Sequence, residues 1–297
     1  MVGFSLKALA FVLNGVWAQG AYAPIELPPG TEEVLLNIGS SLRPVVPAAD
    51  AVNVVSIAFE PMLSVAARIE AHPQLRVVPC AVAASDGLRT LTRYNNDGIS
   101  SSLGRATTDA FWNNNKTRGD GVASIVPVLS FRTVLDAIPY DVGTPYLKTD
   151  MQGADFEAIA SVPHAVLRRI PHLLTEVWVA NTRSYAGFEN DLCRDWMPHM
   201  DAAGYRLVYL RIIEADSMPK DATIRDKWSQ AWMDDPRAMC DDDFQKHPDP
   251  IMGIFEADAH WIRQDVLDKI LRSDPSIRMP PVRDNTDWPI TYPAYGG

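Results

Sequence analysis

The sequence has few cysteines, an excess of acidic over basic residues and no long uninterrupted hydrophobic run. Its 297 residues include only Cys80, Cys193 and Cys240, and no two of these are close enough in sequence for a zinc knuckle or a redox pair. The 37 acidic and 27 basic residues give a formal net charge of −10. Because a negative surface repels a phosphate backbone, nucleic acid is not an expected partner.

The apolar residues near the N-terminus form two short runs, 8–13 and 16–18. These are too short and too interrupted for a membrane-spanning helix. Lys7 before them and the small-x-small pattern at 21–23 fit a signal peptide or anchor over residues 1–23. The alternative is a helix packed on the domain, which would leave a cytoplasmic protein. Membrane association is expected only through this segment, and Asn115 is a glycosylation acceptor only in the secretory pathway.

The remaining composition is that of a globular protein, with 47% hydrophobic and 22% charged residues. We expect one domain over residues 24–273 and a proline-rich, extended tail over 274–297. The segment 218–250 is an acidic insertion. Its aspartates lack the spacing of a calcium-binding loop, so we expect a solvated loop and no metal.

Short apolar runs alternate with segments of helical length. The runs expected to be strands are 34–39, 52–59, 75–84, 88–94, 145–149, 173–180, 205–213 and 254–262, and the expected helices are 62–71, 130–138, 154–168, 188–203 and 263–272. Continuous apolar strands separated by helices predict an α/β fold with a parallel sheet. The polar segment 95–121 is expected to be a long surface loop.

Two residues at the ends of consecutive strands indicate a nucleotide-type cofactor. Gly39 ends the first run, where a residue without a Cβ lets the backbone approach a ligand. Glu60 ends the next run, 21 residues later, at the place where a carboxylate can accept hydrogen bonds from ribose hydroxyls. The sequence therefore predicts that Gly39 and Glu60 lie at opposite ends of one nucleoside pocket.

Asp150 ends the strand 145–149 and is expected beside the same crevice. There its carboxylate could orient the sulfonium region of a cofactor or a substrate hydroxyl, and act as a general base. The structural alternative is that Asp150 caps the next helix, with Asp155 in the first turn. His164 and His172 are weaker candidates for the base.

Four blocks in this order resemble the FkbM family of methyltransferases: 36–39 (LNIG), 58–61 (AFEP), 100–103 (SSSL) and 147–155 (LKTDMQGAD). The segments 81–87 and 256–259 also fit the family pattern. The resemblance covers roughly residues 34–262. It implies a Rossmann-like class I methyltransferase fold, with a mostly parallel seven-stranded sheet whose last strand is antiparallel.

The resemblance also implies S-adenosylmethionine as the cofactor and a hydroxyl on a small molecule or sugar as the acceptor. By position, the residues implied to bind the cofactor are Asn37, Gly39, Ser40, Glu60, Pro61, Ala81, Val82, Ser101, Ser102, Asp150 and Met151. Gly39 would line the methionine end and Glu60 would bind the ribose. Asp150 would flank the methyl group, as the catalytic residue.

The chain departs from the family pattern at four positions. Asn37 stands where aspartate is usual, Ser41 where asparagine is usual, Arg43 where a second glycine is usual, and Gln152 where glutamate is usual. These changes keep open a catalytically degenerate binding or scaffold domain. An NAD-dependent oxidoreductase would also suit the glycine-to-acid spacing, but the full G-x-G-x-x-G pattern is absent.

Overall fold

A seven-stranded sheet forms the centre of the computed structural model, which describes residues 25–48, 50–94, 100–107, 121–179, 183–212, 235–240 and 256–273. The strand order is β11-β12-β9-β8-β1-β2-β3. Their bounds are β1 Glu33–Ile38, β2 Val54–Phe59, β3 Leu75–Val78, β8 Gly143–Thr149, β9 His172–Trp178, β11 Tyr205–Ile212 and β12 Glu256–Arg263. Each of these strands coincides closely with an apolar run of the sequence.

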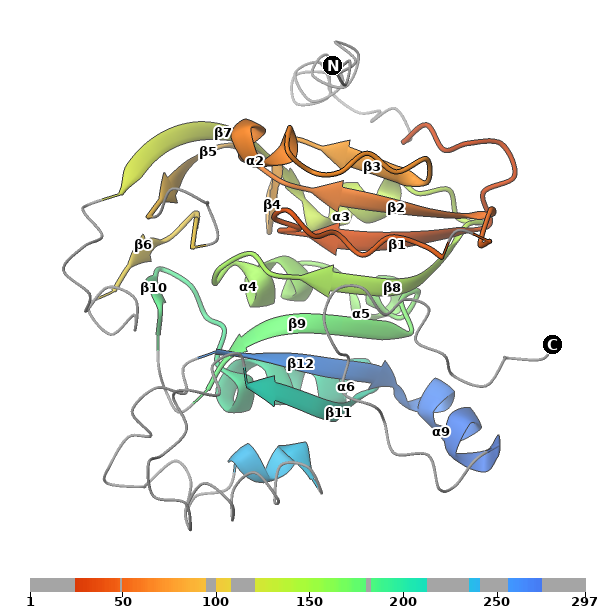
Figure 1. The fold of residues 1–297 in the computed structure, drawn as a ribbon. Coiled ribbons are helices and arrows are strands. Elements are labelled where there is room, and N and C mark those ends of the chain that lie inside the picture. The colour runs from red at the N-terminus through yellow and green to blue at the C-terminus, as the bar shows by residue number, and fades with distance from the viewer. Residues whose placement is uncertain are drawn as a thin grey trace.

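Most neighbouring strands of this sheet are parallel. β1 pairs in parallel with β2 and β8, β2 with β3, and β8 with β9. β12 runs antiparallel to both β9 and β11. The arrowheads of β1, β2 and β8 point to the same side in Figure 1, where β5, β6 and β10 also lie. The expected α/β fold with a large, mostly parallel sheet is confirmed, and it is consistent with a Rossmann-like methyltransferase fold.

The helices α3 (Phe131–Asp136), α4 (Asp155–Ala160), α5 (His164–Leu167) and α6 (Met197–Ala203) lie behind the sheet in Figure 1. Their apolar residues join those of β1, β2, β8, β9 and β12 in the main core. Ser130 caps α3 as expected, because its side chain accepts a hydrogen bond from the Thr133 amide. α9 (Gln264–Ser273) packs on Ile262 through Val266 and Ile270.

The apolar run 75–84 is two strands in different sheets, because the chain turns at Cys80, whose amide donates to Val78 O. After the turn, β4 (Ala81–Ala83) joins a three-stranded sheet with β7 (Val122–Ser130) and β5 (Gly87–Arg93). The strand β7 was not expected from the sequence. The expected loop 95–121 contains a further short strand, β6 (Arg105–Ala106), which pairs with β10 (Tyr185–Ala186).

Three expected helices differ from the observed ones. The helix expected over 62–71 is the single turn α2 (Leu63–Ala66), and the helix expected over 154–168 is broken at Pro163 into α4 and α5. Proline lacks the amide hydrogen that would continue the helix. The expected helix 188–203 begins only with the π-helical segment η2 (Leu192–Trp196) and continues as α6. It ends as expected at Gly204, which is left-handed at φ 83°.

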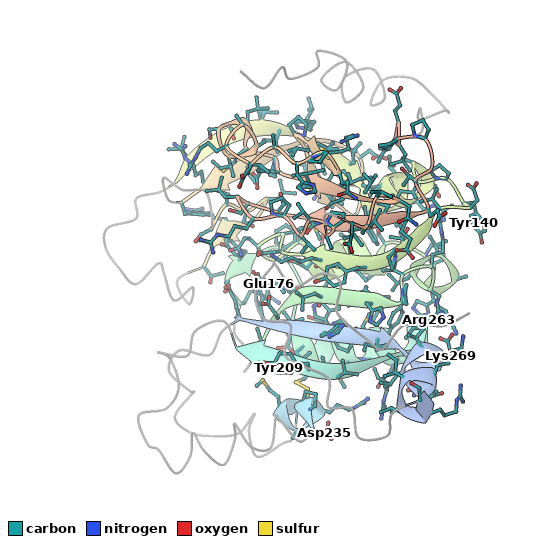
Figure 2. All side chains as sticks on the ribbon, turned by 45° about the vertical axis from the view of Figure 1, so that its right-hand side comes forward. Tyr140, Glu176, Tyr209, Asp235, Arg263 and Lys269 are labelled. Carbon is teal, nitrogen blue, oxygen red and sulfur yellow. A yellow bond between two sulfur atoms is a disulfide. The ribbon has the colours of Figure 1, made fainter. Side chains whose placement is uncertain are left out.

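A disulfide joins Cys193, in η2, to Cys240, the last residue of the 3-10 turn η4 (Pro236–Cys240). The yellow sulfur–sulfur bond lies near Asp235 in Figure 2. The Arg237 guanidinium also binds the Asp201 carboxylate, with nitrogen–oxygen distances of 2.8 and 3.1 Å. This pairing was not predicted, because 47 residues separate the two cysteines in the sequence.

Several expectations fall outside the described residues. These are the signal peptide or anchor at 1–23, the acceptor Asn115, most of the acidic insertion 218–250 and the tail 274–297. Within the part of the chain that is described, no helix combines the length and the apolar character that crossing a membrane requires.

Candidate functional site

A pocket opens at the carboxyl ends of β1, β2 and β8. It encloses about 600 Å³, including the space at its open mouth. Its lining residues are Ile38, Gly39, Ser41, Glu60, Pro61, Cys80, Ala81, Val82, Leu91, Ser101, Leu103, Asp150, Met151 and Gln152. Gly39, Glu60 and Asp150, each predicted from a strand end, thus line one pocket. This is the edge at which ligands bind in open α/β sheets.

The backbone at Gly39 turns sharply between β1 and the following loop. Gly39 is left-handed, with φ 72°, and its amide donates to Phe59 O at 3.0 Å. A Cβ on Gly39 would lie 1.8 Å from Asp150 O, because the end of β8 passes directly against this turn. The glycine therefore allows the ends of β1 and β8 to meet, which brings Asp150 to the pocket.

Glu60 is almost fully buried, and both of its carboxylate oxygens are oriented by backbone amides. Oε2 accepts from the Ser41 amide at 3.0 Å and Oε1 from the Met62 amide at 2.9 Å. Burial raises the pKa of Glu60 to about 6, against the opposing effect of these hydrogen bonds. A carboxylate has about four lone-pair sites, so each oxygen retains capacity for a hydroxyl donor in the pocket.

The pocket wall beyond Glu60 is apolar. Cys80, Ala81 and Val82 form it where the chain passes from β3 into β4, together with Leu91 of β5 and Leu103. Cys80 is buried and is a free thiol, and burial raises its pKa above the ordinary value. Such a wall suits the flat, largely apolar face of a nucleobase, while polar groups elsewhere fix its orientation.

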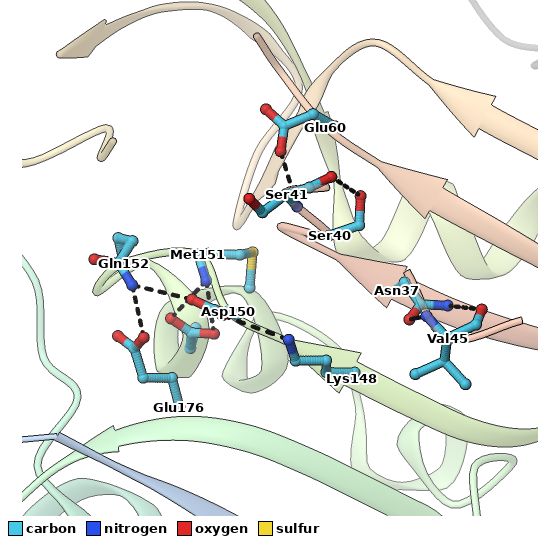
Figure 3. A network of polar contacts seen from close by, with 11 residues as sticks. Asn37, Ser40, Ser41, Val45, Glu60, Lys148, Asp150, Met151, Gln152 and Glu176 are labelled. Atoms are coloured by element: carbon cyan, nitrogen blue, oxygen red, sulfur yellow. Dashed lines mark hydrogen bonds and ion pairs between the residues drawn. The ribbon is translucent and has the colours of Figure 1, made fainter. Parts of the chain in front are cut away.

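At the other end of the pocket, Asp150 is held by two side chains (Figure 3). Its Oδ1 accepts from Gln152 Nε2 at 3.0 Å, and its Oδ2 lies 3.5 Å from Lys148 Nζ. The Lys148 side chain is 8% exposed and that of Asp150 is 33% exposed. The carboxylate is therefore oriented from the protein side and remains open toward the pocket.

Asp150 does not cap the helix α4, whose N-cap is Ala154, although Asp155 does lie in the first turn as the structural alternative expected. The fully buried Asp155 serves the turn instead, accepting hydrogen bonds from the Met151 and Gly153 amides. Burial, followed by the nearby Asp150 charge, raises the pKa of Asp155 to about 7. Because Asp155 satisfies the turn, the Asp150 carboxylate is free for another role.

Three residues that the resemblance assigned to the cofactor do not line the pocket. The buried Asn37 bonds Val45 and Ser56 instead: Nδ2 donates to Ser56 Oγ and Val45 O, and Oδ1 accepts from the Val45 amide. Ser40 is buried beneath the turn. Ser102 donates to Gln152 O at 2.7 Å and accepts from the Gly104 amide. Asn37 and Ser102 thus join separate segments of the chain, whereas the Ser40 hydroxyl contacts only the neighbouring Ser41 carbonyl.

The departures from the family pattern have local physical explanations. An aspartate at 37 could not donate to Ser56 Oγ or Val45 O, so asparagine suits this buried position. Ser41 has φ 48°, in the left-handed region where asparagine is enriched, in agreement with the usual residue there. Arg43 is exposed and does not line the pocket, so it does not obstruct the site.

The sequence did not indicate Glu176 and Tyr185, which lie behind the Asp150 end of the pocket. Glu176 Oε2 accepts from Gln152 Nε2 at 2.7 Å, and the Tyr185 hydroxyl lies 2.8 Å from Gln152 Oε1. A lone carboxylate in the apolar strand 172–178 was the only available signal. His164 and His172 do not line the pocket, and no group of metal-ligating residues occurs in the described ranges.

Comparison with known proteins agrees with this geometry. The family model described as the methyltransferase FkbM domain matches residues 33–207, more than half of the 297 residues. The match spans the turn at Gly39, the acid at Glu60 and the Asp150 region. No curated protein matches the sequence. The chain belongs to the FkbM methyltransferase domain family.

Proposed function

We propose that the protein is an S-adenosylmethionine-dependent methyltransferase that acts on a hydroxyl of a small molecule or sugar. One observation carries the proposal. The ends of β1, β2 and β8 bring Gly39, Glu60 and Asp150 to the lining of a single pocket, with Ala81 and Val82 completing its wall. Family membership supports methyl transfer as the reaction class.

The residues present fit the proposed cofactor. The apolar wall at Ala81, Val82 and Leu91 suits the adenine. The two oriented oxygens of Glu60 suit the ribose hydroxyls. The half-open Asp150 carboxylate suits the positively charged sulfonium, since opposite charges attract strongly where water is excluded. Ser101, whose hydroxyl lies 3.1 Å from Met62 Sδ, borders the same space.

When bound, the cofactor supplies an electrophilic methyl group. The protein then contributes mainly by positioning the acceptor and excluding water. We assign to Asp150 the role of general base: its carboxylate would take the acceptor's hydroxyl proton as the carbon–oxygen bond forms and the methyl–sulfur bond breaks, with S-adenosylhomocysteine as the leaving product. The hydrogen bond from Gln152 and the nearby Lys148 ammonium keep that carboxylate in one orientation.

Calorimetry with three ligands tests the proposal. We expect the protein to bind S-adenosylmethionine and S-adenosylhomocysteine and not NAD. Binding of NAD alone would assign the pocket to an oxidoreductase. If none of the three binds, the degenerate scaffold domain becomes the better explanation, and the pocket is not a cofactor site.

A further inference from the structure

The Gln152 side chain bridges two carboxylates behind the pocket. Its Nε2 donates to Asp150 Oδ1 at 3.0 Å and to Glu176 Oε2 at 2.7 Å (Figure 3). Both hydrogens of one amide nitrogen are thus used on carboxylate oxygens. Asp150 directly follows β8, and Glu176 lies in the neighbouring strand β9, so the amide joins two strands at the pocket.

The orientation of the Gln152 amide is set from its other end. The Tyr185 hydroxyl donates to Gln152 Oε1 at 2.8 Å, and Tyr185 is fully buried. Because carboxylate oxygens accept and the tyrosine hydroxyl can donate, only one orientation of the amide satisfies all three contacts. A charged glutamate at this position could not donate to either Asp150 or Glu176, and a protonated one could donate to only one of them.

The backbone of Gln152 is held as firmly as its side chain. Gln152 is left-handed, with φ 53°, a conformation that residues other than glycine rarely adopt. The Ser102 hydroxyl donates to Gln152 O at 2.7 Å. Uncommon backbone conformations persist where several contacts determine them together, and such positions cluster at functional sites.

The burial and charge of Glu176 explain why the Gln152 amide lies between the two acids. Glu176 is 2% exposed. Burial, followed by the nearby charges of Glu256 and Asp150, raises its pKa well above the ordinary value. The raised pKa favours a proton on Glu176, and the amide hydrogen that Gln152 gives to Asp150 Oδ1 orients the other carboxylate of the pair.

We propose that Gln152 is a positioning residue that holds the Asp150 carboxylate toward the cationic end of the bound cofactor. The inference rests on the proposed function. It goes further in assigning a role to the residue that departs from the family's usual glutamate. Gln152 acts through Asp150 and not directly on the acceptor.

The test compares two ligands that differ by one charge. S-adenosylmethionine carries a positive sulfonium and S-adenosylhomocysteine does not, so the ratio of their affinities reports the negative charge beside the sulfur. Contacts shared by both ligands, such as those to Glu60, cancel in this ratio. We would measure it by calorimetry between pH 5.5 and 8.5 for the unsubstituted protein, Gln152→Met and Gln152→Glu. Gln264→Glu, on the exposed start of α9, is the control for an added charge.

In Gln152→Met, we expect S-adenosylmethionine to lose about tenfold in affinity while S-adenosylhomocysteine changes little, since a charge-assisted hydrogen bond has been lost. In Gln152→Glu, the pH at which the ratio falls on acidification should rise by about one unit, because a third carboxyl favours proton binding. Gln264→Glu should change neither quantity. If Gln152→Met does not fold, as judged by circular dichroism, the Gln152→Glu shift decides.

Equal losses for both ligands, with an unchanged pH dependence, would overturn the inference and leave Gln152 with a merely structural role. That outcome leaves the proposed function intact, because the unsubstituted protein still binds both ligands. If the unsubstituted protein binds neither ligand, the proposed function fails, and this inference fails with it.

Discussion

Buried titratable groups occur in two regions of the main sheet, and the two regions use them differently. At the pocket edge, Glu60 lines an open space and Asp155 lies fully buried in the turn after β8, and both accept hydrogen bonds from backbone amides. Near the start of β9, the rings of His172 and His260 lie 5.9 Å apart inside the protein. Neither nitrogen of His260 has a hydrogen-bond partner.

Burial shifts the pKa of the acids and of the histidines, but hydrogen bonds oppose that shift only at the pocket edge. Burial raises the pKa of Asp155 to about 7 and lowers that of His260 to about 3, so both environments favour the neutral form. At the pocket edge, amide donors offset part of this effect, because they stabilise the charged carboxylates. A charged His260 would need a hydrogen-bond acceptor for each ring N–H, and neither nitrogen has a partner, so charging it destabilises the fold.

The largest expected effect is at the pocket edge, in Gly39→Ala. The left-handed backbone and a Cβ 1.8 Å from Asp150 O should together lower the free energy of unfolding by about 4 kcal/mol. Urea denaturation measures this change. Separation of β1 from the end of β8 would also abolish cofactor binding.

Gly30→Ala is the matched control, because Gly30 has φ 82° but no atom within 4 Å of an added Cβ. It should cost only about 1 kcal/mol, from the backbone conformation alone. Equal costs for the two variants would show that the contact with Asp150 O is not close in solution, and would remove Gly39 as the residue that lets the strand ends meet.

The next effect belongs to the histidine pair and appears on acidification. Burial lowers the folded-state pKa of His172 to about 4 and of His260 to about 3, against an unfolded value near 6.5. The unfolded chain therefore binds more protons between these values, and the stabilising contribution is present above pH 6.5 and lost as pH falls. For His260 the loss is on the order of 3 kcal/mol between pH 6.5 and 4.

Urea denaturation across this pH range, for the unsubstituted protein and His260→Phe, isolates the effect. The difference between the two is needed because the raised pKa values of Glu60 and Asp155 act with the opposite sign, favouring the folded state at low pH. The variant should lose less stability on acidification. Parallel pH profiles would mean that His260 is solvated or hydrogen-bonded in solution.

A smaller effect is expected in Glu60→Ala, which should weaken binding of S-adenosylhomocysteine by about 1–3 kcal/mol if the ribose hydrogen bonds form. In the unsubstituted protein, binding should also weaken as pH falls below about 6, where Glu60 becomes protonated. The variant should lack this pH dependence. Glu157→Ala, on α4 outside the pocket lining, serves as the control. If Glu60→Ala binds S-adenosylhomocysteine as tightly as Glu157→Ala does, Glu60 is excluded from the site.

Much of the sheet could be predicted from sequence because its strands are buried on both faces. All six residues of β2 and all seven of β9 are buried, and such strands read as continuous apolar runs. β7 was missed although most of its nine residues are apolar, because Pro127 interrupts the run and a proline within a run argues against a strand. The division of 75–84 into β3 and β4 depends on tertiary pairing, which an apolar run does not encode.

The residues of the site also divide into those that could be predicted from the sequence and those that could not. Gly39, Glu60 and Asp150 could be predicted because each directly follows a strand, and the ends of parallel strands meet at one edge. Glu176 and Tyr185 could not, because their contacts with Gln152 depend on side chains that come from segments 24 and 33 residues further along the chain. Asn37 and Ser102 lie outside the pocket lining for a related reason: proximity to a motif does not determine which way a side chain faces.

The disulfide between Cys193 and Cys240 has a consequence for how the protein tolerates heat. A bridge that closes a loop with a separation of 47 residues should reduce the conformational entropy of the unfolded chain by the equivalent of about 4 kcal/mol. In its reduced form, the turn η4 would be attached through the Arg237–Asp201 ion pair and the buried Met239. Two preparations with identical sequences would therefore melt at different temperatures according to the oxidation of this single pair of sulfur atoms.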